Sequence, residues 1–137
     1  PHAPEAARLL NTDTSTIQND SMAAAARLAE NFKCYAVLRG AGSICAAPGG
    51  RRYINTSGNP GLSSAGTGDI LSGIAGALLA QGLNAENALL LAVCLHGAAA
   101  DALKKQHGGP LGMTASEIPN AARSLLNQWI YYHSPGD

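Results

Sequence analysis

The chain has 137 residues, of which 46% are hydrophobic and 13% charged, and this predicts one globular domain over residues 1–137 with a hydrophobic core. Nine Lys and Arg residues balance nine Asp and Glu residues, so there is no excess of cations for binding nucleic acid or an anionic membrane. The three cysteines form no CxxC pair, which argues against a disulfide framework and a zinc site and favours a reducing, cytoplasmic setting.

Three further expectations come from the start of the chain and from its most apolar part. Residues 88–100 are shorter than the roughly 20 residues that a membrane span needs, so no span is predicted. No signal-peptide pattern is present either. The chain begins at Pro1 without an initiator Met, and we interpret it as an interior piece of a longer protein.

The first part of the chain predicts two helices. A short helix over residues 4–10 begins with Pro, which is tolerated in a first turn. After a polar break, Ser15 and Gln18 have the spacing of a capping box. Apolar residues then recur at helical spacing through about Asn31. A single second helix is therefore expected from Ser15 to Asn31.

Three short strands are predicted next. Residues 34–39, CYAVLR, are typical of a buried strand. Glycines turn the chain into a second strand over residues 43–47, and Pro48 to Gly50 turn it into a third over residues 51–54. The pattern predicts a strand followed by a hairpin.

Three helices are predicted in the second half. The first covers residues 67–81, with Gly82 as a C-terminal cap residue. The second is capped by Asn84 and is apolar almost all round at its centre, as a buried helix should be. Thr114 and Glu117 form a capping box that opens the last helix.

Two glycines, Gly73 and Gly76, lie inside the first of these helices. Glycine in a helix interior costs about 1 kcal/mol relative to Ala, so a compensating interaction is expected. Together with nearby alanines they predict a helix face that packs very closely on a neighbour.

The segment before that helix is rich in glycine, which tolerates positive φ and lets a ligand approach the backbone. The free N–H groups near Gly66, Thr67 and Gly68 would point out of the helix together with the positive end of its dipole. This pattern predicts an anion site, most simply for phosphate.

Asp69 lies directly behind these amides, in the first helical turn. A carboxylate beside a phosphate site suggests a base that takes a proton from a substrate hydroxyl. The alternative, that Asp69 only satisfies backbone N–H groups at the helix start, is equally open. The segment matches neither GxxxxGK[ST] nor GxGxxG, and it misses the GxSxG pattern of hydrolases.

Four segments occur in one order along the chain: PHAPE, VLRGAGSICAAPGGRRYIN, GNPGLSSAGTGDILSGIAGALLAQG and LHGAAAD. This set resembles the C-terminal half of the ADP/ATP-dependent NAD(P)H-hydrate dehydratases, the ribokinase-like YjeF C-terminal domain. The resemblance runs from Pro1 to about Leu103 and more weakly to the end. It implies a partial α/β ribokinase-like nucleotide-binding fold, with a mostly parallel sheet flanked by helices and a β-hairpin.

The resemblance also implies an activity, that of a nucleotide-dependent lyase that repairs hydrated NADH and NADPH (NADHX and NADPHX). The nucleotide, ADP or ATP with Mg²⁺, phosphorylates the hydrate hydroxyl, and loss of phosphate restores the dihydropyridine ring. The implied partner is this small-molecule substrate, with neither nucleic acid nor membrane.

Site residues follow from the same resemblance. Asp69 matches the GxGD aspartate that meets the hydrate hydroxyl, which makes it the catalytic and a substrate-binding residue. Gly68 matches the glycine at the nucleotide and stands beside Gly66 and Thr67. His2 matches the histidine of a TPHPGE motif that touches the substrate. The KGxxT segment that wraps the nucleotide falls on Arg39, Gly40, Ala41, Gly42 and Ser43. No residue is assigned to a metal.

The chain departs from the family pattern in three ways. Arg39 replaces the usual Lys, which keeps the charge but changes the shape. Ala3 and Pro4 stand where Pro and Gly are expected. The chain is also roughly half of the family domain and lacks its N-terminal strands. We therefore expect it to form a homo-oligomer or to associate with a missing N-terminal half.

Two other functions stay open. A ribokinase-like kinase of a small alcohol, such as a vitamin precursor, would use Asp69 as the same base but leave the phosphate on the product. A truncated, non-catalytic fragment would bind nucleotide weakly or only associate. His96 is interpreted as a core histidine, and Trp129, Tyr131 and Tyr132 as packing or interface residues.

Overall fold

The computed structural model describes residues 1–132, which form two compact units. The first unit comprises residues 1–56 and 84–90. The second comprises residues 57–83 and the described residues from Leu91 onward. A single domain over residues 1–137 stays a prediction.

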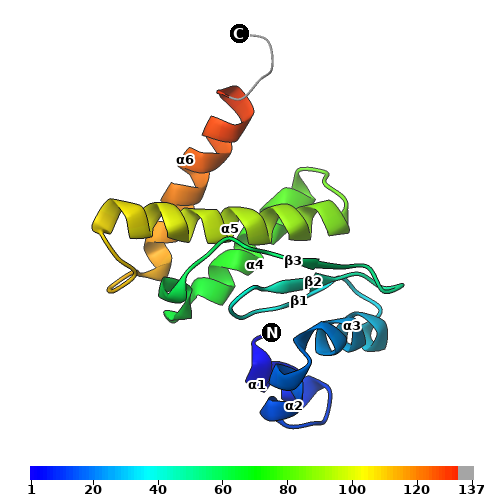
Figure 1. Cartoon of the computed structure of the whole chain (residues 1–137). Helices are drawn as coiled ribbons and strands as arrows, with labels where there is room; N and C mark the ends of the chain where they lie inside the picture. The colour runs from blue at the N-terminus through cyan, green and yellow to red at the C-terminus, as the bar shows by residue number, and fades with distance from the viewer. Residues whose placement is uncertain (133–137) are drawn as a thin grey trace. The chain divides into compact units, whose positions relative to one another are not determined.

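The order of elements follows the sequence closely (Figure 1). The first unit holds α1 (Ala3–Leu9), α2 (Thr14–Asn19), α3 (Ser21–Phe32), β1 (Ala36–Leu38), β2 (Ile44–Ala46), β3 (Arg52–Ile54) and the start of α5 (Ala85–His107). The second holds the 3₁₀ turn η1 (Pro60–Ser63), α4 (Thr67–Ala80), the rest of α5, the 3₁₀ turn η2 (Ala115–Glu117) and α6 (Ile118–Tyr131). The predicted order is confirmed, except that two helices, α2 and α3, replace one.

The sheet of the first unit is antiparallel, in the order β1-β2-β3. Ala36 of β1 pairs with Ala46 of β2, and Ile44 of β2 pairs with Ile54 of β3. The prediction of a mostly parallel sheet is therefore wrong for the described residues, whose one parallel pairing is an isolated bridge between His2 and Arg39. The reason is the length of the connections: turns of a few residues join antiparallel neighbours, whereas parallel strands need crossovers of about a dozen residues.

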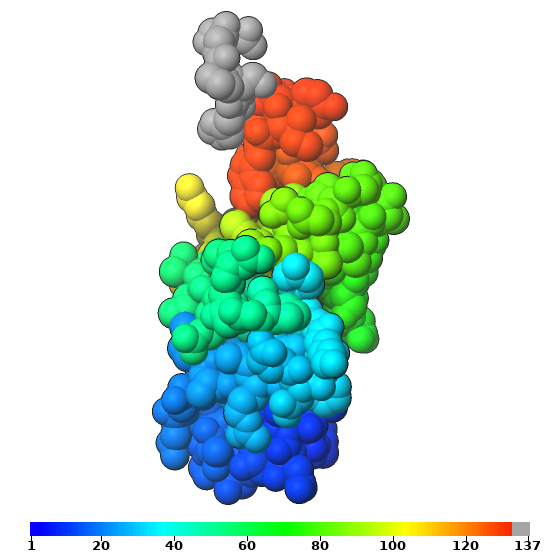
Figure 2. All heavy atoms as spheres, turned by 90° about the vertical axis from the view of Figure 1, so that its right-hand side faces the viewer, coloured from blue at the N-terminus to red at the C-terminus, as the bar shows by residue number. Residues whose placement is uncertain are grey.

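Helix α3 covers one face of this sheet (Figure 1). Side chains alternate along a strand, so every second residue of β1 and β2 faces the helix. The resulting core cluster is built mainly from small and aliphatic side chains: Ala6, Ala7, Leu10, Ile17, Ala24, Ala25, Leu28, Ala29, Ala36, Leu38, Ile44 and Ala46. In the space-filling view of Figure 2, residues from α1 to β1, blue to cyan, form a continuous packed body.

Aspartates, and not Ser15, cap the two helices that replace the single predicted one. Asp13 Oδ1 accepts the backbone N–H of Thr16 at 2.7 Å and the hydroxyl of Ser15 at 2.6 Å. Asp20 then leaves helical geometry and accepts the N–H of Ala23 at 3.0 Å, which begins α3. The capping box predicted for Ser15 is thus wrong, because the carboxylate two residues earlier takes both the amide and the hydroxyl.

Asp13 gives the first unit a predictable acid sensitivity. Hydrogen bonds from the Ser15 hydroxyl, the Thr16 amide and the Thr16 hydroxyl lower the pKa of Asp13 from 3.8 to about 2. This stabilisation is fully present above the unfolded pKa, so we expect it to be lost as the pH falls from 3.8 through about 2. Urea unfolding of the wild type and Asp13→Asn across this range checks the prediction. Asn keeps a cap but does not titrate, so an unchanged pH profile in Asp13→Asn would contradict it.

The second unit has its own core, formed by α4, α5, α6 and the loop before α6. Its buried members are Leu95, Ala99, Ala100, Leu103, Met113, Ile118 and Ala122. Trp129 packs against this cluster, as predicted, whereas the side chains of Tyr131 and Tyr132 are largely exposed. The predicted capping box is confirmed, because Glu117 Oε2 accepts the backbone N–H of Thr114 at 2.8 Å.

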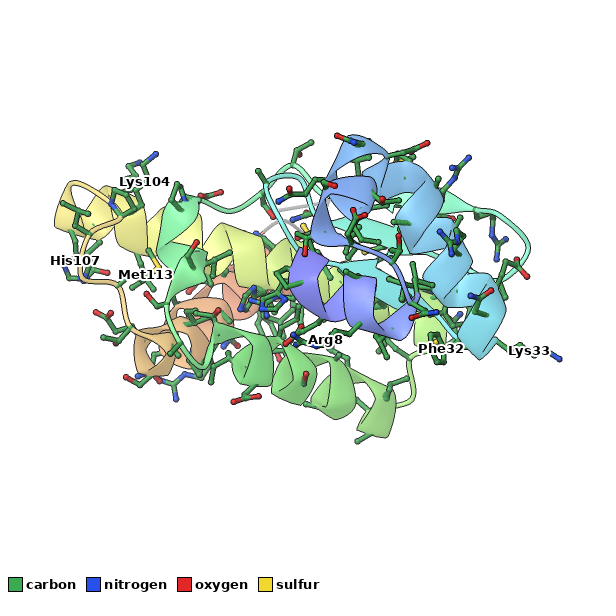
Figure 3. All side chains as sticks on the ribbon, turned by 90° about the horizontal axis from the view of Figure 1, so that it is seen from below. Arg8, Phe32, Lys33, Lys104, His107 and Met113 are labelled. Atoms are coloured by element: carbon green, nitrogen blue, oxygen red, sulfur yellow. The ribbon has the colours of Figure 1, made fainter. Side chains whose placement is uncertain are left out.

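Helix α5 is longer than the apolar run at its centre. It has 23 residues, and by length and composition it could cross a membrane, so the expectation based on residues 88–100 underestimated it. Half of the most apolar 18-residue stretch of this helix is buried inside the protein, and the core helix of a folded domain has the same property. Lys104 and His107 lie in its last turn (Figure 3), where the helix dipole favours cations.

The close packing predicted for α4 is not seen. Gly73 and Gly76 are exposed, and a Cβ added at either would meet nothing within 4 Å. The small-residue pattern therefore has no packing partner among the described residues, and the cost of glycine in this helix is not compensated there.

Candidate functional site

The predicted anion site lies at the start of α4, in the second unit. Gly66 is the N-cap, with a φ of 83°, which only glycine adopts easily. It provides no side chain to cap the helix. Within residues 1–132 the backbone N–H groups of Gly68 and Asp69 have no hydrogen-bond acceptor. Two donors are therefore available at the positive end of a 14-residue helix.

Asp69 stands in the first turn of α4 with an exposed side chain. Its carboxylate makes no hydrogen bond or ion pair with any residue that the structure describes. A capping carboxylate would accept backbone N–H groups of its own helix. The capping alternative is therefore not supported by the geometry, and a proton-accepting role for Asp69 stays a prediction.

The segment before α4 is an ordered loop, which we call the glycine loop (residues 57–66). Asn59 begins η1, and its Oδ1 accepts the N–H of Gly61 at 3.0 Å. Thr67 follows the loop, and its hydroxyl donates to the carbonyl of Leu62 at 2.7 Å. A Cβ on Gly61 would lie 2.8 Å from Met113 Cε, so the flexible Met113 side chain would have to shift. The start of α4 is thus bonded to the preceding 3₁₀ turn.

Helix α5 holds the first residues of the glycine loop. The Ser57 hydroxyl donates to the carbonyl of Cys94 at 3.0 Å, and Asp101 accepts the N–H of Gly58 at 2.8 Å. Gly97 lies between these contacts, and a Cβ there would come within 2.7 Å of the Ser57 backbone. The close approach of loop and helix therefore requires glycine at position 97.

Helix α5 also holds Thr67, the residue that directly follows the glycine loop. His96 is 4% exposed, and its Nε2 lies 2.9 Å from the carbonyl oxygen of Thr67. A carbonyl oxygen only accepts, so Nε2 carries the proton in this contact. The interpretation of His96 as a satisfied core histidine is consistent with this geometry. Its consequence is that the residue before Gly68 and Asp69 is fixed from a second helix.

The segment predicted to wrap the nucleotide forms the turn between β1 and β2, in the first unit. Gly42 has a φ of 73°, and Gly40, Ala41 and Gly42 are exposed. The Ser43 hydroxyl lies 3.4 Å from the N–H of Gly40 and 3.3 Å from its carbonyl oxygen, which closes the turn. Arg39, at the start of the turn, is half-buried.

His2 has a local structural role in the first unit. Its Nδ1 accepts the N–H of Glu5 at 3.4 Å, and its own backbone N–H donates to Glu5 Oε2 at 2.9 Å. This reciprocal pair caps α1. The bridge to Arg39 places His2 beside the turn that follows β1. A role of His2 in substrate binding stays a prediction.

The predicted site residues thus fall into two groups. His2 and residues 39–43 belong to the first unit, and residues 66–69 belong to the second. No group of three or more His, Cys, Asp or Glu side chains within residues 1–132 is placed to hold a metal ion.

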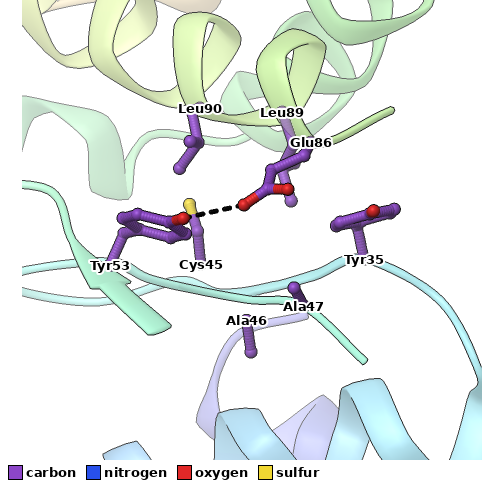
Figure 4. A pocket seen from close by; sticks show the side chains of 8 residues that line it. All are labelled: Tyr35, Cys45, Ala46, Ala47, Tyr53, Glu86, Leu89 and Leu90. Carbon is purple, nitrogen blue, oxygen red and sulfur yellow. Dashed lines mark hydrogen bonds between the residues drawn. The ribbon is translucent and has the colours of Figure 1, made fainter. Parts of the chain in front are cut away.

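A small hollow lies in the first unit, on the face of the sheet opposite α3 (Figure 4). The Tyr53 hydroxyl donates to Glu86 Oε1 at 2.8 Å, and this bond raises the pKa of Tyr53. Arg51 pairs with the other oxygen of Glu86 at 2.7 Å. Burial raises the pKa of Cys45 to about 11, so its thiol is not a nucleophile near neutral pH. No predicted site residue lines this hollow.

A second hollow lies in the second unit, at the end of α5. His107 and Met113 line it (Figure 3), and His107 Nε2 lies 3.7 Å from Glu117 Oε1. Again no predicted site residue is among its lining residues. Neither hollow coincides with the start of α4.

Sequence reasoning missed three residues that shape the site: Asn59, Gly97 and Asp101. Two of them carried a readable signal. Asn59 precedes Pro60, a pattern typical of a turn or helix start, and Gly97 interrupts an apolar helix. Asp101 ends the LHGAAAD segment, but no local pattern indicated its role, because its partners lie 42 and 43 residues away.

Comparison with known proteins agrees with the sequence pattern. Residues 1–123 match the family model for NAD(P)H-hydrate dehydratase. The ADP-dependent (S)-NAD(P)H-hydrate dehydratase of Neisseria meningitidis serogroup B is 45% identical over 128 residues, which are 93% of this chain and 43% of that protein. The bifunctional NAD(P)H-hydrate repair enzyme Nnr of Escherichia coli K12 is 41% identical over 127 residues, which are 93% of this chain and 24% of that protein. The chain therefore spans less than half the length of these two relatives.

Solved structures agree as well. The ADP/ATP-dependent NAD(P)H-hydrate dehydratase of Bacillus subtilis, co-crystallised with ATP and Mg²⁺, matches 94% of this chain at a TM-score of 0.88 and 28% identity. This chain covers 46% of that structure. A ribokinase-like superfamily protein of Enterococcus faecalis matches at a TM-score of 0.79 and 27% identity, which confirms the ribokinase-like α/β fold. On the match of residues 1–123 to the family model, the chain belongs to the NAD(P)H-hydrate dehydratase family.

Proposed function

We propose that this chain carries the catalytic aspartate and the phosphate-binding helix of an ADP/ATP-dependent NAD(P)H-hydrate dehydratase. The observation that carries the proposal is the start of α4, where the Asp69 carboxylate and the N–H groups of Gly68 and Asp69 have no partner among residues 1–132. A base beside unpaired donors at a helix N-terminus suits phosphoryl transfer. The family membership of the chain supplies the substrate class.

In the proposed reaction, Asp69 takes the proton of the hydrate hydroxyl of NADHX or NADPHX. The hydroxyl oxygen attacks the terminal phosphorus of ATP or ADP, and the bond from that phosphorus to the nucleotide breaks. The backbone N–H groups of Gly68 and Asp69 offset the charge on the phosphoryl oxygens. The C–O bond of the phosphorylated hydrate then breaks and phosphate leaves. The neighbouring ring carbon loses a proton to solvent, and the C=C bond that forms restores the dihydropyridine ring.

The other predicted site residues are part of the proposal. Residues Arg39, Gly40, Ala41, Gly42 and Ser43 would contact the nucleotide, and His2 would contact the hydrate. In nucleotide sites Mg²⁺ is held mainly by phosphate oxygens and water with one or two carboxylates. The nucleotide phosphates would supply most of the ligands of such an ion here.

The setting and assembly of the chain are proposed on similar grounds. All three cysteines are free thiols, which suits the reducing cytoplasm. The relatives are more than twice as long as the part this chain matches. We therefore propose association with the remaining part of the family domain, or with a second copy, as the active arrangement.

The function is tested by incubating the chain with NADHX or NADPHX and either ADP or ATP with Mg²⁺. The expected result is recovery of the absorbance of reduced nicotinamide, with release of phosphate. A chimera in which the chain replaces the matching segment of the Neisseria relative serves as the completed protein. If the chimera binds nucleotide but recovers no reduced nicotinamide, the dehydratase proposal fails. Accumulation of a phosphorylated small alcohol in its place would identify a kinase.

A further inference from the structure

We propose that Asp101 and Asn59 are positioning residues for the proposed phosphoryl-transfer site. They form a carboxylate–carboxamide pair that fixes the glycine loop on α5 and thereby sets the position of the amides at the start of α4. The catalytic consequence rests on the function proposed above, but the pairing itself does not.

All three side-chain oxygens of Asp101 and Asn59 accept a hydrogen bond from a residue of the glycine loop. Asp101 Oδ2 accepts the N–H of Gly58 at 2.8 Å, and Asp101 Oδ1 accepts Nδ2 of Asn59 at 2.9 Å. Oδ1 of Asn59 in turn accepts the N–H of Gly61 at 3.0 Å. The orientation of the Asn59 carboxamide is therefore fixed, because its nitrogen faces an acceptor and its oxygen faces a donor.

The Asp101 carboxylate is held by neutral donors. It is partly buried, and within residues 1–132 it forms no ion pair. Partial burial of a charge is costly unless it is well hydrogen-bonded, and hydrogen bonds to an ionised acceptor are stronger than neutral ones. A carboxylate suits this place because two donors from one loop reach its two oxygens, whereas a carboxamide at position 101 would offer a single oxygen.

A continuous series of contacts leads from the pair to the proposed site. Asn59 begins η1, and the carbonyl of Leu62 in η1 accepts the hydroxyl of Thr67, the first residue of α4. Thr67 is also held through its carbonyl by His96 of α5. Asp101 of α5 thus holds the start of the glycine loop, and His96 of α5 holds Thr67, which directly follows the loop. Loss of a hydrogen bond at Asp101 should therefore displace the backbone amides of Gly68 and Asp69.

A reciprocal exchange tests the pair. In Asp101→Asn, the nitrogen of the new carboxamide faces the Asn59 nitrogen, so one hydrogen bond is lost. In Asn59→Asp, the same hydrogen bond is lost and two carboxylates also repel each other, so this variant should disturb the loop more than Asp101→Asn does. The double variant Asp101→Asn with Asn59→Asp restores all three bonds, because the carboxamide at position 101 would donate to the carboxylate at position 59, and the N–H groups of Gly58 and Gly61 would keep their acceptors. We therefore expect the wild type and the double variant to hold the glycine loop equally well, Asp101→Asn to hold it less well, and Asn59→Asp to hold it least well.

Two measurements read out this order. The first is amide hydrogen exchange and chemical shift by NMR at Gly58 and at Thr67 to Asp69, without ligand. The second is turnover of NADHX with ATP and Mg²⁺ in the chimera with the Neisseria relative. We expect Asp101→Asn to lower turnover by about 10- to 100-fold, as a small displacement of a reacting group does. The double variant should recover most of this loss and restore the wild-type exchange pattern.

The outcomes separate this inference from the proposed function. If the wild-type chimera shows no turnover, the proposed function fails, and the exchange pattern still decides whether the pair positions the start of α4. If Asn59→Asp does not fold but the double variant does, the pairing is supported. The inference is overturned if the double variant resembles the single variants, or if Asp101→Asn leaves the signals of Thr67 to Asp69 unchanged.

Discussion

Asp69→Asn is expected to lower turnover of NADHX by about 10²- to 10⁴-fold, the usual contribution of a general base. Asn has nearly the same shape as Asp but cannot take the hydroxyl proton. Nucleotide binding should be unchanged or slightly tighter, because the Asp69 carboxylate accepts no hydrogen bond from the residues that the structure describes. Removing a negative charge beside bound phosphates also reduces repulsion. Steady-state turnover and titration calorimetry with ATP and Mg²⁺ measure the two effects.

Asp20→Asn is a matched control for this variant. Asp20 also stands at the start of a helix, α3, and the same substitution removes one negative charge there while keeping a good N-cap. Asp20 is not among the residues proposed to contact the nucleotide or the hydrate, so the variant should leave both turnover and nucleotide binding unchanged. If Asp69→Asn lost nucleotide affinity or melted at a lower temperature than Asp20→Asn, Asp69 would have a structural role and the proposed base would be wrong.

Sequence signals that act within a few residues predicted the local structure well. Asn84 caps α5, the Thr114 and Glu117 box precedes α6, and Gly82 adopts a positive φ just after the end of α4. Each depends on a side chain or a backbone angle next to the feature it fixes. Two local predictions were wrong. Ser15 was predicted as the cap in place of Asp13, because two capping residues stood close together and the stronger acceptor formed the cap. The break at Asp20 between α2 and α3 was also missed.

Features that depend on distant residues could not be predicted in this way. The parallel sheet was expected from the family resemblance, whereas the strands this chain contains are joined by short turns and pair antiparallel. The role of Asp101 depends on Gly58 and Asn59, more than 40 residues earlier. The small-residue face of α4 predicted packing that the described residues do not provide. Composition alone says which residues can pack, but not which neighbour they meet.

Gly97→Ala is expected to destabilise the chain, although Ala is the better helix former. A Cβ on Gly97 would lie 2.7 Å from both C and O of Ser57, and real Cβ contacts are essentially never closer than 3.0 Å. The obstacle is backbone, so the glycine loop or α5 must move. Overpacking of this kind costs about 1–3 kcal/mol. The same movement would displace the loop that leads into α4, so nucleotide affinity should fall together with stability.

Gly76→Ala provides the matched comparison, because both glycines lie inside long helices and differ in their surroundings. A Cβ on Gly76 meets nothing within 4 Å. The substitution should therefore raise the free energy of unfolding by up to about 1 kcal/mol through helix propensity alone. Chemical denaturation of both variants measures the two free energies of unfolding, with opposite signs expected relative to the wild type. Equal stability of the two variants would mean that the glycine loop does not approach α5 as closely as described. The positioning of the α4 amides by α5 would then lose its structural basis.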